Sequence, residues 1–525
     1  MAHGKFVIIF IRANEAQTGF FRAKPGTEPE TMSKIHANKI AAFLNKEPRD
    51  FTRPDIVKYI KANGVKMVNF RYVAGDGRLK TLNFIINDEK YLDRILSAGE
   101  RVDGSSLFKS IDAGSSDLYV VPRYRTAFVN PFSPVPAVDI LCGFYTADGK
   151  PFASAPGEVL RRAEAEFTKV AGAEFHALGE LEYYIVSPRN PLYPTAAQKG
   201  YHESQPFAKW EALRVEAMAA IAEAGGRIKY GHSEVGLIRA EDSEMAQQEI
   251  EFLPVPASDA ADQLAVAKWM ISAIGHKYGV VISFAPKISI GHAGSGLHVH
   301  TCLLKNGRNI MLEKGSLSAP ARKLIAGFME LAAPMTAFGN TVPTSYFRLV
   351  PHQEAPINVC WAYRNRSALV RIPLGWTNAA GMVKDANPGS ATPSVDPAQT
   401  VEFRSADGSA AVHLLLAGLC VAARRGFERK DALAYADKFF VDKNIYHKEH
   451  AALLEKLPKL PSSCWASAES LAKYRSVFEA KGVFTPQLVD GLIKRLKAYD
   501  DSNLSERLYG KEEEIKKLVD EYLYC

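Results

Sequence analysis

The chain has few of the features that mark disulfide-bonded, zinc-binding or nucleic-acid-binding proteins. Its six cysteines lie far apart in 525 residues and form no C-x-x-C pair. This spacing argues against a disulfide framework or a zinc knuckle and suggests free thiols in a reducing compartment. No run of five or more basic residues occurs, and the net charge of +7 is small for this length. The sequence therefore gives no sign of a nucleic-acid partner, although it suits anionic small molecules.

Long apolar segments are also absent. Residues 6–11 are too short for the core of a signal peptide, and residues 411–423 are interrupted by His413 and too short to cross a bilayer. We therefore expect a cytoplasmic protein with no membrane partner. The hydrophobic fraction of 47% and the charged fraction of 23% are ordinary for globular domains, and the length predicts about two to four of them.

The pattern of elements divides the chain into three parts. Residues 1–50 are a charged extension with little periodicity. Residues 51–150 predict a small α+β domain. It begins with a helix from Thr52 to about Asn63 and continues with a hairpin of 67–73 and 79–85 around Gly75-Asp76-Gly77. Further short strands are expected near 118–121 and 126–129, which would complete this domain near residue 132.

Residues 151–525 predict a larger domain in which helices and strands alternate. One helix starts near Ser154 and is expected to bury Val159, Leu160, Ala163, Phe167 and Val170. Another starts near Ser258 and is expected to bury residues as far as Tyr278. Strands are expected at 179–186, 280–285 and 294–304, and an amphipathic helix at 511–523.

Three polar pairs with i, i+2 spacing fall on expected strands. On a strand, this spacing directs both side chains to one face and the apolar residue between them to the other. Any one pair alone is better explained by a solvated strand face, but three pairs together with the arginines at 344–373 indicate a polar, metal-capable cavity inside a curved sheet. The pairs are Glu180 and Glu182, His298 and His300, and Glu402 and Arg404.

Residues 344–373 concentrate arginines among apolar residues. Arg348, Arg364, Arg366 and Arg371 occur there with one carboxylate, Glu354. The guanidinium fork suits carboxylates and phosphates, so the stretch indicates an anionic ligand or, alternatively, a structural salt-bridge network. With Glu234 and Glu249 added, five carboxylates and one histidine would supply three ligands to each of two hard divalent cations, Mg²⁺ or Mn²⁺.

These segments, in this order from about residue 52, resemble the glutamine synthetase family. The resemblance rests on DGSS at 103–106, GELEY at 179–183, GSGLHVH at 294–300, SYFRLVPHQEAP at 345–356, RNRS at 364–367, RIP at 371–373 and EFR at 402–404. It implies an α+β fold with a small β-grasp domain and a large catalytic domain, in which helices flank a curved antiparallel sheet or half-barrel.

The resemblance also implies an activity: ATP-dependent ligation of ammonium to the γ-carboxylate of glutamate through γ-glutamyl phosphate. Such enzymes form a homo-oligomeric double ring, here expected to be a double hexamer, with active sites between subunits. Two cations, Mg²⁺ or Mn²⁺, would be held in each site. The implied ligands are Glu182, Glu234 and Glu249 for one cation, and Glu180, His298 and Glu402 for the other.

Further roles follow from the same resemblance. Arg348, with Gly294 and the Glu182 site, would bind glutamate, and Arg366 and Arg404 would steady the transferred phosphoryl group. His300 and Arg371 would lie near the nucleotide with Arg366. Glu354 would sit on a flap, accept a proton from the incoming ammonium and shield the intermediate from water.

Two departures from the family leave the nitrogen donor open. Ala74 stands where the family usually carries an aspartate that helps bind ammonium in the neighbouring subunit, with Asp76 two residues on. The segment between Glu234 and Glu249 is longer than usual, which suggests an acidic loop near the amine entrance or a plain surface insertion. A γ-glutamyl-amine ligase is therefore the nearest alternative. A guanidino kinase and a non-catalytic homologue are more distant ones.

Overall fold

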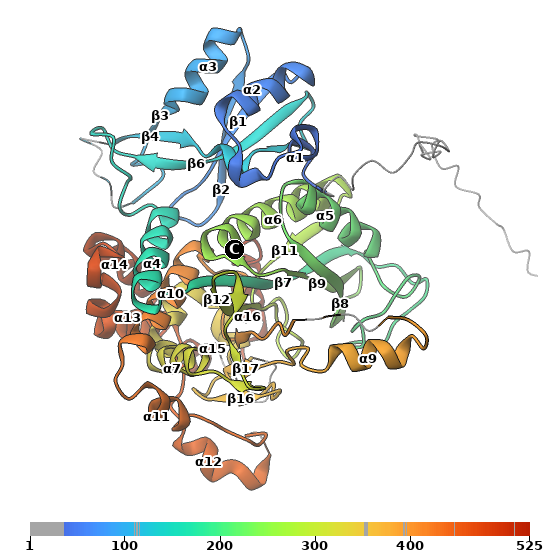
Figure 1. Cartoon of the computed structure of the whole chain (residues 1–525). Coiled ribbons are helices and arrows are strands. Elements are labelled where there is room, and N and C mark those ends of the chain that lie inside the picture. Colours follow the sequence, from blue (N-terminus) through green and yellow to red (C-terminus); the bar gives the residue numbers. More distant parts are fainter. Residues whose placement is uncertain are drawn as a thin grey trace, which may run out of the picture. The chain divides into compact units, whose positions relative to one another are not determined.

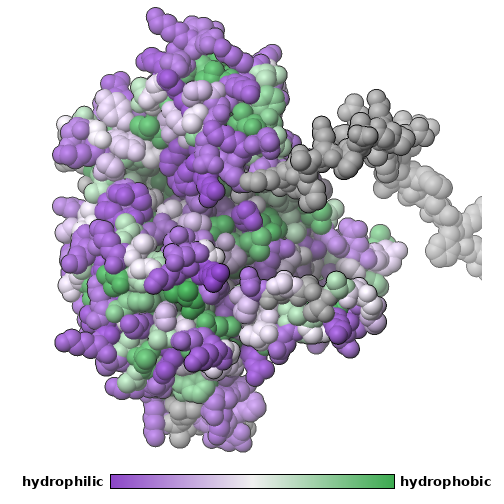
Figure 2. Space-filling view, viewed as in Figure 1, coloured by the Kyte–Doolittle hydropathy of each residue, from purple (hydrophilic) through white to green (hydrophobic). Residues whose placement is uncertain are grey.

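The computed structural model describes most of the chain and shows two main sheets with helices around them (Figure 1). On the face in Figure 2, hydrophilic side chains predominate and apolar ones form small patches, while the large apolar residues fill the core. The described residues are 36–109, 111, 114, 116–350, 355–391, 394, 396–445, 447–508 and 510–525.

The first sheet builds the small domain and contains the predicted hairpin. β1 (Met67–Val73) and β2 (Leu79–Ile85) pair antiparallel with the predicted bounds. The full strand order is β2-β1-β6-β4-β3, with β5 on β6. Its other strands are β3 (Glu100–Asp103), β4 (Asp117–Pro122), β5 (Phe128–Val129) and β6 (Ala137–Tyr145).

The central strand of this sheet, β6, was missed by the sequence reading. It pairs parallel to β1 and antiparallel to β4, and it is buried along most of its length. A strand covered on both faces has no alternation of polar and apolar residues, so its pattern did not stand out. The expected strand at 126–129 is shorter than predicted, because Tyr124–Thr126 form a 3₁₀ turn (η3) before β5.

Local signals explain the helices of the small domain. α2 (Arg53–Ala62) begins as predicted, because the Thr52 amide donates to Asp55 Oδ2 at 2.8 Å in a capping box and Pro54 occupies the first turn. The other helix of the domain is α3 (Glu89–Ala98). Before them, α1 (Lys39–Leu44) buries Ile40 completely, and the 3₁₀ turn η1 (Pro48–Asp50) follows it. Residues 38–50 thus pack onto the small domain.

The second sheet carries the polar pairs. Its strand order is β16-β17-β18-β12-β7-β9-β8, with β10 and β11 on β7 and β13 on β12. Apart from the parallel pair β16–β17, its recorded pairs are antiparallel. The strands are β7 (Glu174–Pro188), β8 (Ile228–Arg239), β9 (Ser243–Phe252), β10 (Val255–Pro256), β11 (Val281–Ser283), β12 (Leu297–Lys305), β13 (Arg308–Asn309), β16 (Trp361–Tyr363), β17 (Val370–Ile372) and β18 (Val401–Phe403); β14 (Leu312–Glu313) and β15 (Ser316–Leu317) pair separately.

Helices flank this sheet, as predicted. α4, α6 and α10 contact one another, and α4 and α6 contact β7, while α7 and α13 pack beyond α10. No helix in the described residues is long and apolar enough to cross a membrane. The helices are α4 (Pro156–Ala171), α5 (Glu211–Glu223), α6 (Ala257–Lys277), α7 (Ala319–Gly339), α8 (Ser345–Arg348), α9 (Ala379–Ala386), α10 (Val412–Glu428), α11 (Ala432–Asp437), α12 (Ala451–Lys456), α13 (Cys464–Glu479), α14 (Pro486–Lys497), α15 (Leu504–Leu508) and α16 (Glu512–Glu521).

Two core predictions were wrong, and both concern helix ends. Val170 is 41% exposed in the last turn of α4, and Tyr278 is 39% exposed where α6 ends. A helix that extends past the sheet it covers no longer buries its apolar stripe, so periodicity overstates burial there. The final helix, α16, lies where it was predicted and buries Val519.

A buried ionic group joins the small domain to the large one. Arg123 donates to both carboxylate oxygens of Asp262 on α6, at 2.8 and 3.0 Å. His413 Nε2 on α10 lies 3.2 Å from the same carboxylate. The paired geometry fixes the planar guanidinium against the carboxylate.

Candidate active site

Cross-strand register assembles the polar residues of the second sheet. Residues directly opposite each other in adjacent strands point to the same face. His298 lies opposite Glu180, and Glu402 lies opposite both His300 and Arg371. On the other side of β7, Glu180 lies opposite Glu251, and Glu249 of β9 lies opposite both Glu182 and His232. One face of the sheet therefore carries acidic and basic side chains from six strands.

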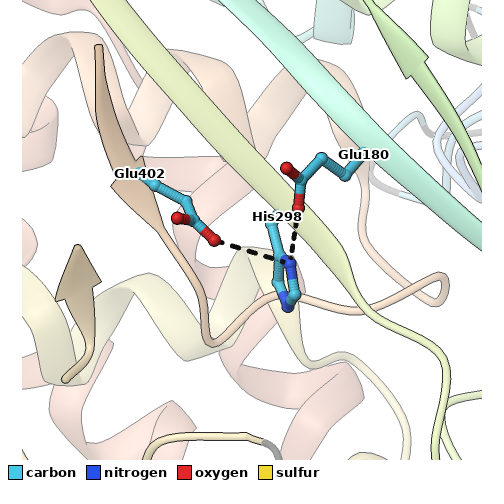
Figure 3. Close-up of side chains that lie close together, drawn as sticks. All are labelled: Glu180, His298 and Glu402. Carbon is cyan, nitrogen blue, oxygen red and sulfur yellow. Dashed lines mark hydrogen bonds and ion pairs between the residues drawn. The ribbon is translucent and has the colours of Figure 1, made fainter. Parts of the chain in front are cut away.

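The first group consists of Glu180, His298 and Glu402 (Figure 3). His298 Nδ1 lies 2.8 Å from Glu180 Oε2 and 3.7 Å from Glu402 Oε1. One ligand atom from each residue lies within 4.8 Å of the others. These are the three residues expected to share one cation, and the structure brings them together.

Arginines balance the charge of Glu402, which is fully buried. Arg371 Nη1 donates to Glu402 Oε2 at 2.7 Å, and Arg404 Nη1 donates to the other oxygen. Burial raises the pKa of the Glu402 carboxyl, but the Arg404 guanidinium together with His300 and His298 outweighs this effect and holds the pKa below its usual range. Arg371 and Arg404 thus lie beside the first group, at the edge of the cavity.

His300 lies behind the first group rather than in the wall of the cavity. Its Nε2 is 2.9 Å from Glu180 Oε1, and its Nδ1 is 2.9 Å from the Thr400 hydroxyl. Burial lowers the pKa of His300, but the carboxylates of Glu180, Glu402 and Glu251 together outweigh burial and raise the pKa. Burial likewise raises the pKa of Glu180, but His300 and His298 together hold it well below the usual value. Glu251 joins these two residues in a further group of possible ligands.

The second group contains His232 with Glu234 and Glu249. His232 Nδ1 lies 3.7 Å from Glu234 Oε2, and His232 Nε2 lies 3.8 Å from Glu249 Oε2. Glu182, the third ligand expected here, is held differently: its Oε2 accepts from the Gly296 amide at 2.8 Å and from Gln247 Nε2 at 3.0 Å. It lies between the two groups, 4.0 Å from His298 Nδ1.

The donors at this face fit divalent cations. Burial raises the pKa of Glu249 well above its usual value, and the carboxylates of Glu180, Glu182, Glu234 and Glu251 raise it further. Such crowding of buried carboxylates is unfavourable unless positive charge offsets it. Carboxylate oxygens with one imidazole in each group are ligands that Mg²⁺ and Mn²⁺ accept. These groups could therefore hold metal ions.

The cavity beside these groups has a volume of about 380 Å³. Arg348 at the end of α8 is 5% exposed, and its Nη1 donates to Ser405 O at 2.9 Å while Nη2 lies 3.3 Å from His298 Nε2. Gly294 packs against the Arg348 side chain. Arg366 also lines the cavity, and no hydrogen bond or ion pair within the described residues holds its guanidinium.

Three further features were expected near the site, and the structure describes two of them. Glu354 lies outside the described residues. The segment between Glu234 and Glu249, expected as an acidic loop or a plain surface insertion, forms the β8–β9 hairpin. Glu241 and Asp242 lie in its exposed turn, and Glu244 is a buried strand residue. Ala74 is buried, and Asp76 Oδ2 accepts from Lys80 Nζ at 2.5 Å.

His232 and Glu251 were missed, although a signal for both was present. His232 precedes Glu234, and Glu251 follows Glu249, each at the i, i+2 spacing that identified the other pairs. Other residues that line the cavity, such as Tyr201, Lys287 and Asn444, come from connecting segments. Their placement depends on tertiary contacts that no local pattern reveals.

Comparison with known proteins gives the same picture as the geometry. The sequence model of the glutamine synthetase β-grasp domain matches residues 64–147, and that of the glutamine synthetase catalytic domain matches residues 153–511. Glutamine synthetase of Thermus thermophilus is 30% identical over 444 residues, covering 82% of this chain and 92% of that protein. Glutamine synthetase of Methanococcus maripaludis is 29% identical over 437 residues, covering 81% and 91%.

Solved structures share the fold. Plasmodium falciparum glutamine synthetase superposes with a TM-score of 0.70 at 20% identity, covering 87% of this chain and 99% of that one. A GmaS complex with ADP gives 0.69 at 18% identity, covering 85% and 96%. The α+β prediction, with a β-grasp domain and a curled half-barrel sheet, is confirmed. The chain belongs to the glutamine synthetase family and is a ligase that forms carbon–nitrogen bonds.

Proposed function

We propose that this protein ligates ammonium to the γ-carboxylate of glutamate and consumes ATP, with γ-glutamyl phosphate as the intermediate. The observation that carries the proposal is the pair of acidic groups, Glu180–His298–Glu402 and His232–Glu234–Glu249, beside a cavity that members of both groups line together with Arg348 and Arg366. A carboxylate is a poor electrophile, so activation by phosphate must precede attack by an amine. The arginines and the acidic groups of the site supply charged side chains for both stages, phosphorylation of the carboxylate and attack by the amine.

Arg348 is the proposed clamp for the α-carboxylate of glutamate. Its buried guanidinium lines the cavity and is held in a fixed orientation by Ser405 O and His298, and a rigid guanidinium suits a carboxylate. Gly294 lines the cavity beside Arg348, and its backbone would complete the contact with the substrate. This places the glutamate next to Glu182 and the second acidic group.

Phosphoryl transfer needs positive charge around the transferred group. We assign this role to Arg366 and Arg404, with Arg371 and His300 on the nucleotide side. Each of the two acidic groups would hold one divalent cation, Mg²⁺ or Mn²⁺. In the second group, Glu182 would bind the cation together with His232 or instead of it. When bound, the cations would neutralise phosphate charge. Arg366 has no competing partner among the described residues, so its guanidinium remains available for that group.

The amine must lose a proton before it attacks, and the acyl phosphate must be kept from water. The family resemblance assigns both tasks to Glu354 and its flap. It also implies a double ring in which the β1–β2 hairpin of one subunit completes the site of the next. We propose the same assembly here.

The test is phosphate release from ATP with magnesium and glutamate, with ammonium compared against small amines. We expect phosphate to be released when ammonium is present at low millimolar concentration. The Glu402→Gln variant should remain folded but lose this activity. Arg429→Gln, which changes a charged residue that pairs with Glu330 and Asp431 and is not among the described residues lining the cavity, is a control expected to stay active. Full turnover by Glu402→Gln would overturn the assignment of the first group.

A γ-glutamyl-amine ligase is the second candidate, and a specific observation favours it. The β1–β2 hairpin supplies no free carboxylate for ammonium, since Ala74 is buried and Asp76 is bonded to Lys80. The aromatic rings of Tyr201 and Tyr230 flank His232 at the cavity wall. Release with an alkylamine but not with ammonium would select this candidate. Ala74→Asp should then lower the KM for ammonium, and an unchanged KM would show that the loop does not contact the donor.

A further inference from the structure

A second cavity, separate from the active site, lies under the connection between β7 and α5. Its volume is about 370 Å³, and it shares no lining residue with the active-site cavity. The connection runs beside β8, as its amides at Gln198 and His202 donate to Leu237 and Ser233, and Figure 1 shows this segment at that edge of the sheet. The cavity is lined by Glu244, Trp210, Tyr193, Leu192, Pro206 and Lys209, among others.

Strand register directs Glu244 toward this cavity and away from the active site. Glu244 on β9 lies directly opposite Ser187 on β7, so the two side chains share a face. The Ser187 hydroxyl accepts a hydrogen bond from Trp210 Nε1 at 3.1 Å, which puts Trp210 on that face. Glu249, five residues along the same strand, faces the opposite way.

Glu244 is a buried carboxylate without a partner. The residue is 2% exposed, and within the described part of the chain its side chain forms no hydrogen bond or ion pair. A buried carboxylate is strongly disfavoured unless a donor or a positive charge meets it. Arg239 lies opposite Glu244 on β8, but its guanidinium donates to the carbonyl of Thr195. The cavity next to Glu244 is therefore the place from which a positive charge can reach the carboxylate.

The walls of the cavity suit the apolar part of a ligand. Trp210 and Tyr193 are aromatic, and aromatic faces attract cations as well as apolar groups. Both residues hold a left-handed backbone, with φ of 66° and 48°, a conformation that costs free energy and gathers at ligand sites. Lys209 does not supply the missing charge to Glu244, because its ammonium group donates to the carbonyls of Leu192 and Asn190.

We propose that this cavity binds a small organic ammonium ion with an apolar body. Its nitrogen would pair with Glu244, and its alkyl or aryl group would pack between Trp210, Tyr193 and Pro206. A divalent metal ion is the wrong ligand, because Glu244 is the single carboxylate among the described residues that line the cavity and hard cations take several such ligands. The site is independent of the proposed ligase reaction, which uses Glu249 on the other face of the same strand.

The test is an isothermal titration calorimetry experiment in which benzylammonium chloride is added to the full-length protein. Benzyl alcohol serves as the uncharged control. We expect saturable binding of one benzylammonium per chain and much weaker binding of the alcohol. Glu244→Gln, which removes the charge and keeps the shape, should weaken binding by roughly tenfold to a hundredfold. Ligase turnover should stay at the native level in this variant, since Glu244 does not face the active site.

A matched variant on the same strand separates the two sites. Glu249→Gln removes a carboxylate from the active-site face, and benzylammonium binding at the second cavity should survive it. Trp210→Leu should weaken binding through loss of an aromatic wall while its circular dichroism spectrum stays native. Binding that Glu249→Gln abolishes and Glu244→Gln leaves intact would show that the ligand occupies the active site. That result would overturn the proposal, as would the absence of saturable binding.

Discussion

Replacement of Gly294 by alanine tests how closely the glutamate side of the site is packed. A Cβ at this position would lie 2.4 Å from Pro286 O and 3.1 Å from Arg348 Cγ. Ordinary van der Waals contact requires the methyl group and the carbonyl to separate by about 1 Å more. The backbone of residues 294–296 must therefore move, and Arg348 must move with it. A displacement of about 1 Å in an active site costs about a hundredfold in rate.

The assay is steady-state ligase kinetics with glutamate as the varied substrate. We expect kcat/KM for glutamate to fall about a hundredfold, which corresponds to about 2.7 kcal/mol of lost transition-state stabilisation. The control is Gly491→Ala on α14, where an added Cβ meets no atom within 4 Å. This control should be active and slightly more stable, by up to about 1 kcal/mol. A Gly294→Ala enzyme with native kinetics would refute the close approach of Pro286 and Arg348.

Three further predictions concern charge. Burial and neighbouring carboxylates raise the pKa of Glu249 in the folded protein, so ionisation of this carboxyl above its unfolded pKa destabilises the fold. Glu249→Gln should therefore raise Tm by about 1–2 °C in EDTA at pH 8. With Mg²⁺ present, the variant should lose this advantage. Asp262→Asn should lower the free energy of unfolding by roughly 2–3 kcal/mol, because it leaves Arg123 unpaired. Arg123 and His413 overcome burial and hold the pKa of Asp262 below 3.8, so this loss should be full at neutral pH and shrink as the pH falls below about 4. A loss that does not change with pH would contradict the pairing. Arg348→Lys should raise the KM for glutamate roughly tenfold to a hundredfold with a smaller change in kcat, because the paired fork is lost; an unchanged KM would remove Arg348 from the glutamate site.

Local signals were enough to predict several elements closely. The capping box at Thr52 and Asp55 fixed the start of α2, and the apolar alternation around Gly75-Asp76-Gly77 fixed both strands of the first hairpin. These features depend on residues close together in the chain, so the sequence contains the whole of the relevant physics. β6 and the β8–β9 hairpin were missed because their patterns reflect burial by distant segments.

The composition of the site was likewise predictable, but its grouping was not. The i, i+2 pairs at Glu180, His298 and Glu402 specified side chains on one face of each strand, and their convergence followed once those strands became neighbours. His232 rather than Glu182 lies in the group with Glu234 and Glu249. Both residues lie opposite Glu249, but the Glu182 carboxylate is held by the Gly296 amide and Gln247. A shift of one residue in the β8–β9 register would have turned His232 away.

The sequence by itself determined which side chains can carry the chemistry and which face of each strand presents them, because both follow from residue type and a period of two. Tertiary structure alone decided which strands are adjacent and in what register, and with that which carboxylates lie close enough together to hold a cation. It also decided that Glu244 faces a second cavity. Those choices depend on packing between segments far apart in the chain, where the free energy comes from burial of whole surfaces rather than from any local pattern.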